Sequence, residues 1–187
     1  MTDQSCRTTN QKWTTMIDSK SEIQRRVSQT AYIRKLERIM GYRPELQRFT
    51  SPEIVSEFRE KLDRQVNSAV VTKMVIPFVE RLSNRFAALI AELERRNPNP
   101  IFIWIAGTNE CGFADPIPLH EFRFGFEFEC IPEGIISLVT TDASDRMLMD
   151  FEKDDKGMEI MTIELSGAGW GDAELKDLVA LAPQAIV

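Results

Sequence analysis

The apolar residues in the first half of the chain recur every three or four positions, which is the spacing of an amphipathic helix. This spacing predicts a helix over 19–40 that ends at Gly41, and a second helix over about 52–67. A Ser-Pro-Glu triplet begins the second helix with a hydroxyl cap, a proline at the first helical position and an acid near the positive end of the helix dipole. The N-terminal part of the chain is therefore expected to be helical.

A third helical stretch, from about residue 70 to Arg96, has apolar residues at the same three- and four-residue steps. Its roughly 27 residues would form a rod of about 40 Å. Pro77 would remove one backbone hydrogen bond and kink the rod. Because the apolar stripe is long, this helix could also pair with its copy, so a homodimer is one option that the pattern leaves open.

After the Asn-Pro-Asn-Pro segment at 97–100 the apolar pattern changes to alternation. A continuous apolar run at 101–106 predicts a buried strand, and 107–120 is expected to be a long loop. Tight turns between further short apolar runs predict an antiparallel meander. Its four strands are expected at 121–129, 135–140, 146–152 and 158–165, followed by a short helix at about 172–181.

These elements predict an α+β fold in which N-terminal helices, including the long kinked one, pack on one face of a C-terminal antiparallel meander. Residues 1–18 are polar and are interpreted as a flexible arm. Residues 19–187 are interpreted as a single domain with a helical half at 19–96 and an acidic sheet half at 101–187.

Composition places the chain among ordinary globular proteins, with 43% hydrophobic and 28% charged residues. The N-terminal segment has no apolar region typical of a signal peptide, and no window approaches about 20 uninterrupted apolar residues. The sequence therefore predicts a cytoplasmic protein that does not bind a membrane. Cys6, Cys111 and Cys130 are too few and too scattered for a disulfide framework, so reduced thiols are expected.

Charge is divided unevenly along the chain. Residues 1–100 contain 18 basic and 12 acidic side chains, a net charge of +6, whereas 101–187 contain 5 basic and 17 acidic side chains, a net charge of −12. Such asymmetry indicates a charged partner, or an attraction between the two halves of the chain. The predicted meander would place a row of carboxylates opposite its apolar face. The row consists of Glu121, Glu127, Glu129, Asp150 and Glu164.

A surface that combines carboxylates with aliphatic groups suits a basic protein, because complementary charge accelerates encounter and apolar contact slows dissociation. The leading hypothesis is a non-enzymatic interaction protein whose acidic sheet surface binds and neutralises or chaperones a basic protein partner. Its sharpest form is an immunity or inhibitor role, in which carboxylates take the place of a nuclease's phosphate substrate. A solvated sheet face with no partner would explain the same row.

Nucleic-acid binding is the first alternative. The basic side chains of the first helix could neutralise phosphates along a nucleic acid, although Glu22 and Glu37 interrupt them. The candidates are Arg25, Arg26, Arg34, Lys35 and Arg38.

An enzyme centred on the 107–120 loop is the second alternative. His120 is the single histidine of the chain, and Cys111 lies on the same loop, so a histidine-dependent nucleophile would use this pair. No nucleophile elbow or oxyanion motif accompanies them, and a structural role explains both.

The remaining motifs predict neither a metal nor a cofactor. Cys111, His120 and Cys130 lack the close ligand pair with which structural zinc sites begin. The Asp-Asp-Lys-Gly segment at 154–157 has the wrong register for a calcium loop and is typical of a hairpin turn. The glycine-rich segment at 166–172 lacks both phosphate-loop spacings, so a connection anchored by Trp170 is expected.

Overall fold

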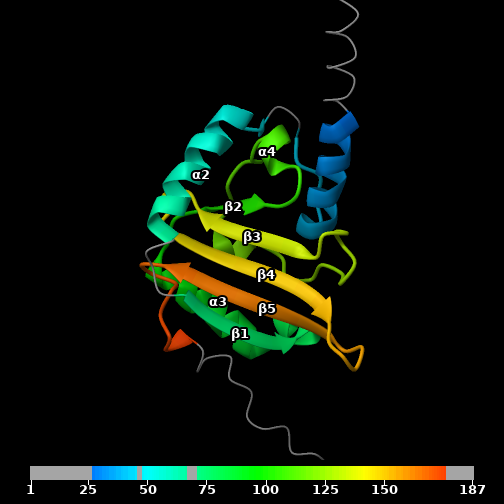
Figure 1. The fold of residues 1–187 in the computed structure, drawn as a ribbon, viewed down its shortest axis with the longest axis vertical. Helices are drawn as coiled ribbons and strands as arrows, with labels where there is room; N and C mark the ends of the chain where they lie inside the picture. Colours follow the sequence, from blue (N-terminus) through cyan, green and yellow to red (C-terminus); the bar gives the residue numbers. More distant parts are fainter. Residues whose placement is uncertain (1–26, 46–47, 67–70, 176–187) are drawn as a thin grey trace, which may run out of the picture.

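The computed structural model describes residues 27–45, 48–66 and 71–175. In this part of the chain, helices lie on both faces of a five-stranded antiparallel sheet with the strand order β1-β5-β4-β3-β2 (Figure 1). The strands are β1 (Val71–Pro77), β2 (Ile101–Trp104), β3 (Ile135–Thr140), β4 (Asp145–Lys153) and β5 (Glu159–Gly167). The predicted mixture of helices with an antiparallel sheet is confirmed, and β2 to β5 match four of the five predicted strands.

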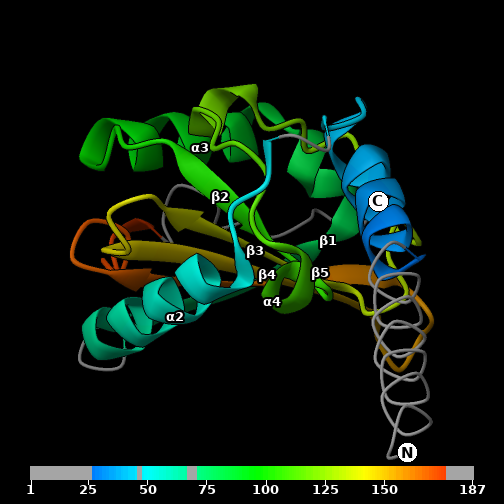
Figure 2. The ribbon, with the colours of Figure 1, turned by 90° about the horizontal axis from the view of Figure 1, so that it is seen from above.

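The helices divide between the two faces of the sheet (Figure 2). Helix α3 covers one face, α2 crosses the other, and the helix at 27–40 stands at one end of the sheet with its apolar side chains in the main core. The helices after residue 50 in the described ranges are α2 (Pro52–Val66), η2 (Phe78–Leu82), α3 (Asn84–Arg96), α4 (Thr108–Cys111) and η3 (Leu119–Glu121). The prediction that the helices all pack on one face of the sheet is therefore not confirmed.

The predicted helix boundaries agree with local hydrogen bonds. Helix α2 begins at Pro52, and the Ser51 hydroxyl accepts a hydrogen bond from the backbone N–H of Ile54 at 3.5 Å. Gly41 follows the first helix with φ at +74° and donates its N–H to the carbonyl of Glu37 at 2.9 Å. A glycine is favoured there because other residues strain at positive φ.

The predicted long helix is wrong, because residues 71–77 form the edge strand β1. Thr72 and Ile76 face the core, while Val71 and Val75 are exposed, so burial follows the two-residue period of a strand. The segment is rich in β-branched residues, which are stiff in a helix and pack well on a pleated sheet. A homodimer through a continuous long helix therefore has no structural basis here.

Helix α3 begins independently after the strand. The hydroxyl of Ser83 accepts a hydrogen bond from the backbone N–H of Phe86 at 3.2 Å, which caps the helix N-terminus. The prediction of helical structure from 78 to 93 is correct in part, because these residues form two separate helices, η2 and α3, where one continuous helix was expected.

The predicted strand at 121–129 is also wrong. Backbone turns occur there instead, with the N–H of Phe122 bonded to Leu119 and the N–H of Cys130 bonded to Glu127. The alternation of burial nevertheless persists, since Phe122 and Phe126 are buried and the acidic residues Glu121, Glu127 and Glu129 are exposed. In the sheet, β3 is paired on both sides, by β2 and β4, so the segment at 121–129 packs its rings on the core without pairing with β3.

The two faces of the sheet differ in their cover. The face toward α3 holds the main core, in which Leu89, Leu93 and Ile136 are fully buried. On the other face, α2 lays Phe58 and Leu62 against Trp104 and Val139. This second cluster covers the β2 and β3 end of the sheet, whereas Val71 and Val75 on β1 remain 51% and 56% exposed.

The segment after β5 is held by the buried carboxylate of Asp145. Its Oδ1 accepts hydrogen bonds from the backbone N–H groups of Gly169 and Trp170 at 2.7 and 2.8 Å, and its Oδ2 accepts one from the Asn97 amide at 2.7 Å. Trp170 is fully buried, so it anchors this connection as expected. The predicted arm at 1–18 and most of the predicted helix at 172–181 lie outside the described residues.

Candidate functional site

Three carboxylates predicted to bind a partner lie together on the segment that follows η3. We call Glu121, Glu127 and Glu129 the acidic ridge; all three are exposed, and within the described ranges none forms an ion pair. The intervening phenylalanines point inward, with Phe122 and Phe126 buried in the core. The ridge is therefore held by its own apolar side chains while its charges face solvent.

Helix η2 supports the ridge from one side. The guanidinium of Arg81 donates to the carbonyl of Phe126 at 2.6 Å and to that of Phe78 at 2.7 Å, and it lies 3.7 Å from the Phe78 ring centroid. The same short helix leaves Val79 and Leu82 66% and 62% exposed. Exposed aliphatic side chains thus adjoin a segment that carries exposed carboxylates.

Asp150 and Glu164 lie elsewhere, on the outward face of the sheet. The strand register places Asp150 between Ile135 and Thr162. The Glu164 carboxylate forms an ion pair with Lys73 at 3.0 Å across β5 and β1. The ridge packs on the core side of the sheet through its phenylalanines, so the five predicted carboxylates do not form one surface.

The residues of the nucleic-acid hypothesis are only partly visible. Arg25 and Arg26 lie outside the described residues. Arg34 and Arg38 are exposed on the helix at 27–40. Lys35 forms an ion pair with Glu133 at 2.5 Å, so its charge is already paired with an acidic side chain of this protein.

The residues of the enzyme hypothesis have separate environments. Nδ1 of His120 lies 2.5 Å from the Glu94 carboxylate, and this hydrogen bond raises the pKa of the imidazole. Cys111 is buried, and burial raises the pKa of its thiol, which disfavours the nucleophilic thiolate. Burial likewise raises the pKa of Cys130 to about 11. No hydrogen bond joins His120 to Cys111 among the described residues.

The other motifs have structural partners. Two N–H groups of the glycine-rich segment are directed to Asp145, where a phosphate loop would direct them to a ligand. Gly157 has φ at +78°, and the Asp154 carboxylate accepts from the N–H groups of Lys156 and Met158, which makes a hairpin turn. Across the described ranges, no three His, Cys, Asp or Glu side chains are grouped so as to hold a metal ion.

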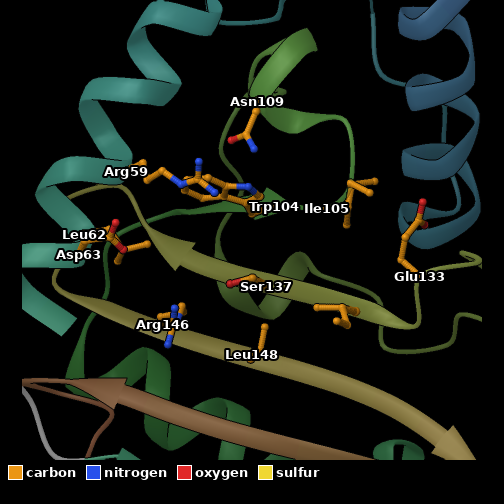
Figure 3. Close-up of a pocket in the computed structure, with 12 residues that line it drawn as sticks. Arg59, Leu62, Asp63, Trp104, Ile105, Asn109, Glu133, Ser137, Arg146 and Leu148 are labelled. Atoms are coloured by element: carbon orange, nitrogen blue, oxygen red, sulfur yellow. The ribbon is translucent and has the colours of Figure 1, made fainter. Parts of the chain in front are cut away.

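A second candidate site, which the sequence pattern did not reveal, lies between α2 and the outward face of the sheet (Figure 3). It is a cleft of about 440 Å³. One part of its lining is apolar: Leu62, Trp104, Ile105, Ala106, Ile135 and Leu148. The polar part consists of Arg59, Asp63, Asn109, Glu133, Ser137 and Arg146.

Two arginines approach this cleft from opposite walls. Arg59 extends from α2, and its guanidinium carbon lies 5.7 Å from the centre of the Trp104 ring. Arg146 extends from β4 on the floor. Its Nε is shielded from solvent and has no hydrogen-bond partner among the described residues. The only sequence signal for this site was that Arg146, Leu148 and Asp150 share one face of a predicted strand.

No protein-family model, curated protein or solved structure matches this chain. Its function must therefore be argued from the two sites themselves.

The helices also bear on the prediction about the membrane. None of those in the described residues combines the length and the apolar character that crossing a bilayer requires.

Proposed function

We propose that this chain is a protein-binding protein, without catalytic activity, whose acidic ridge binds and neutralises or chaperones a basic protein. The observation that supports the proposal is that Glu121, Glu127 and Glu129 are exposed and unpaired within the described residues, while Phe122 and Phe126 between them are buried. A carboxylate that already faces solvent without an internal partner keeps its charge for a ligand.

The surroundings of the ridge favour a protein over a small cation. Val79 and Leu82 on η2 offer apolar surface beside the carboxylates, and protein interfaces combine an apolar centre with a polar rim. The Arg81 hydrogen bonds and the aromatic contacts hold the ridge in place before binding, so little ordering would be needed on association.

An immunity or inhibitor role is the sharper form of this proposal. Three carboxylates spaced along one segment would take the positions of substrate phosphates in the basic groove of a nuclease. Asp150 and Glu164 belong to this proposal only as a second, separate acidic area, because they lie on the other face of the sheet.

The test is to reverse the three ridge charges together, as Glu121→Lys, Glu127→Lys and Glu129→Lys. Capture from native lysate, followed by calorimetry with the purified basic partner, should show binding weakened by about a hundredfold, since close charge pairs couple by several kcal/mol. The matched control reverses Glu57, Glu60 and Glu110, three exposed acidic residues of α2 and α4, and changes net charge by the same amount.

Recovery of the same basic partner by the wild-type chain and the control, but not by the ridge variant, supports the proposal. Equal binding by the ridge variant contradicts it. Loss of the partner in the control variant alone would move the binding surface to the side of the sheet that α2 covers.

A further inference from the structure

We infer that the cleft between α2 and the outward face of the sheet binds a phosphate monoester that carries an apolar or aromatic body, with Arg59 and Arg146 holding the phosphate. This site lies on the opposite side of the sheet from the acidic ridge and binds the opposite charge. The inference therefore does not depend on the proposed function.

The first argument is the state of Arg146. The register sets it between Val139 and Ser166 on the outward face, where its Nε is buried without an acceptor among the described residues. A buried donor without a partner destabilises the fold, because burial removes its hydrogen bonds to water and no protein acceptor replaces them. The Arg146 side chain lines the cleft, so an anion bound there would pair with its guanidinium charge.

The second argument is the placement of Arg59 relative to Arg146. Figure 3 shows both side chains at the same end of the cleft, Arg59 on the α2 wall and Arg146 on the β4 floor. Guanidinium groups match phosphate geometry through paired N–H donors, and Arg59 is also oriented by the face of Trp104. Two such groups on opposite walls suit an anion with several oxygens and two charges better than a single carboxylate.

The acidic residues in the cleft do not neutralise these arginines. Asp63 lines the same end of the cleft, yet no ion pair joins it to Arg59 or Arg146 in the described part of the chain. Glu133 lines the other end and is paired with Lys35 at 2.5 Å. The arginine end therefore keeps a net positive charge, which a dianion would complement.

The third argument concerns the rest of the ligand. The cleft volume of about 440 Å³ falls within the usual range of small-molecule sites, roughly 300–1,000 Å³, and exceeds what a free phosphate needs. Trp104 and Leu148 provide apolar surface near the arginine end, and Ile135 extends this surface farther along the cleft. An organic group attached to the phosphate would cover that surface.

The test is calorimetric titration of the full chain with phenyl phosphate, adenosine monophosphate, inorganic phosphate and phenol. Saturable binding of at least one of the two monoesters, weaker binding of inorganic phosphate and no detectable binding of phenol are expected. Arg59→Gln and Arg146→Met should each weaken monoester binding by about tenfold or more, because each removes charge-assisted hydrogen bonds. Arg64→Gln, on the same helix but outside the cleft lining, should leave the affinity unchanged.

A further variant, Asp63→Asn, is expected to strengthen monoester binding. Asp63→Asn removes a negative charge from the arginine end and should tighten monoester binding by a few-fold. If Arg146→Met does not fold, Arg59→Gln and Asp63→Asn decide the question, since both residues are exposed. The inference is overturned if no probe binds saturably, or if these two variants bind the monoester as the wild type does.

Discussion

The acidic ridge and the cleft lie on opposite sides of one sheet, and they are assembled in opposite ways. The ridge is one continuous run of residues, held by phenylalanines that alternate with its carboxylates. The cleft combines Arg59 from α2, Trp104 from β2 and Arg146 from β4. The net charge of −6 thus conceals two surfaces of opposite sign, and Arg146 of the cationic site belongs to the strongly acidic half of the chain. Charge summed along a sequence does not give its distribution in space.

The largest effect that separates the two regions is expected from Phe126→Ala. Phe126 is buried and contacts Phe78, Phe122 and Phe151, so its removal should lower the free energy of unfolding by about 3–5 kcal/mol. The ridge should lose its fixed position and bind the basic partner more weakly, while phenyl phosphate affinity stays unchanged. Urea unfolding and calorimetry measure the two results.

Phe126→Leu is the matched control, because it keeps most of the apolar volume and should cost less than the alanine variant. If Phe126→Ala weakened phenyl phosphate binding as much as partner binding, the two regions would be coupled and the comparison would fail.

A smaller effect, confined to the other face, is expected from Leu62→Ala. Leu62 is buried against Val139 and Ala143 and holds α2 on the sheet, so its truncation should lower the free energy of unfolding by about 2–3 kcal/mol. The α2 wall carries Arg59, so phenyl phosphate binding should weaken while partner binding at the ridge persists.

Ile54→Ala on the exposed side of the same helix is the control and should change stability by about 0.5 kcal/mol or less. Equal phenyl phosphate affinities of the two variants in calorimetry would show that the α2 contact does not shape the cleft.

The smallest effect concerns pH. The hydrogen bond to Glu94 raises the pKa of His120 above its ordinary value of about 6.5, so the folded state binds this proton more tightly than the unfolded chain does. The resulting stabilisation is complete below that ordinary value and disappears as pH rises through the folded-state pKa. Because the histidine is exposed, the change should be slight.

Urea midpoints measured from about pH 5.5 to about pH 8.5 test this, with His120→Gln as the control that should lack this component. A wild-type midpoint that rises relative to the variant across this window would contradict the assigned sign.

Much of the fold follows from local pattern. The hairpin strands β3, β4 and β5 alternate clearly and are joined by short turns. Helix α2 has its own start residue, Ser51, and the helix at 27–40 has its own stop residue, Gly41. In these elements local preference agrees with tertiary packing, so the sequence was sufficient to predict them.

The two wrong elements fail for different physical reasons. In β1, an apolar spacing of three and four residues competed with β-branched composition, and pairing with β5 favoured the strand. At 121–129, the alternation correctly predicted which side chains are buried, yet a strand also needs a neighbour in the ladder, and these residues form turns instead. The pattern determined burial there but not hydrogen bonding.

The two sites also differ in how far each could be identified from the sequence. The ridge carboxylates were identified because they are contiguous, although their separation from Asp150 and Glu164 required the strand order. The cleft could not be predicted, because Arg59, Trp104 and Arg146 meet only after α2 crosses the sheet on the face away from α3. No local rule specifies which face a helix will cover.

The hydrogen bonds of Asp145 also constrain when the chain can finish folding during synthesis. Gly169 and Trp170, which donate to its carboxylate, are synthesised 24 and 25 residues after it. A carboxylate deprived of donors is costly to remove from water, so the start of β4 cannot be fully enclosed until these residues have left the ribosome. Completion of the fold is therefore expected after translation of residue 170, and a chain shortened before Gly169 would reach only a less stable state.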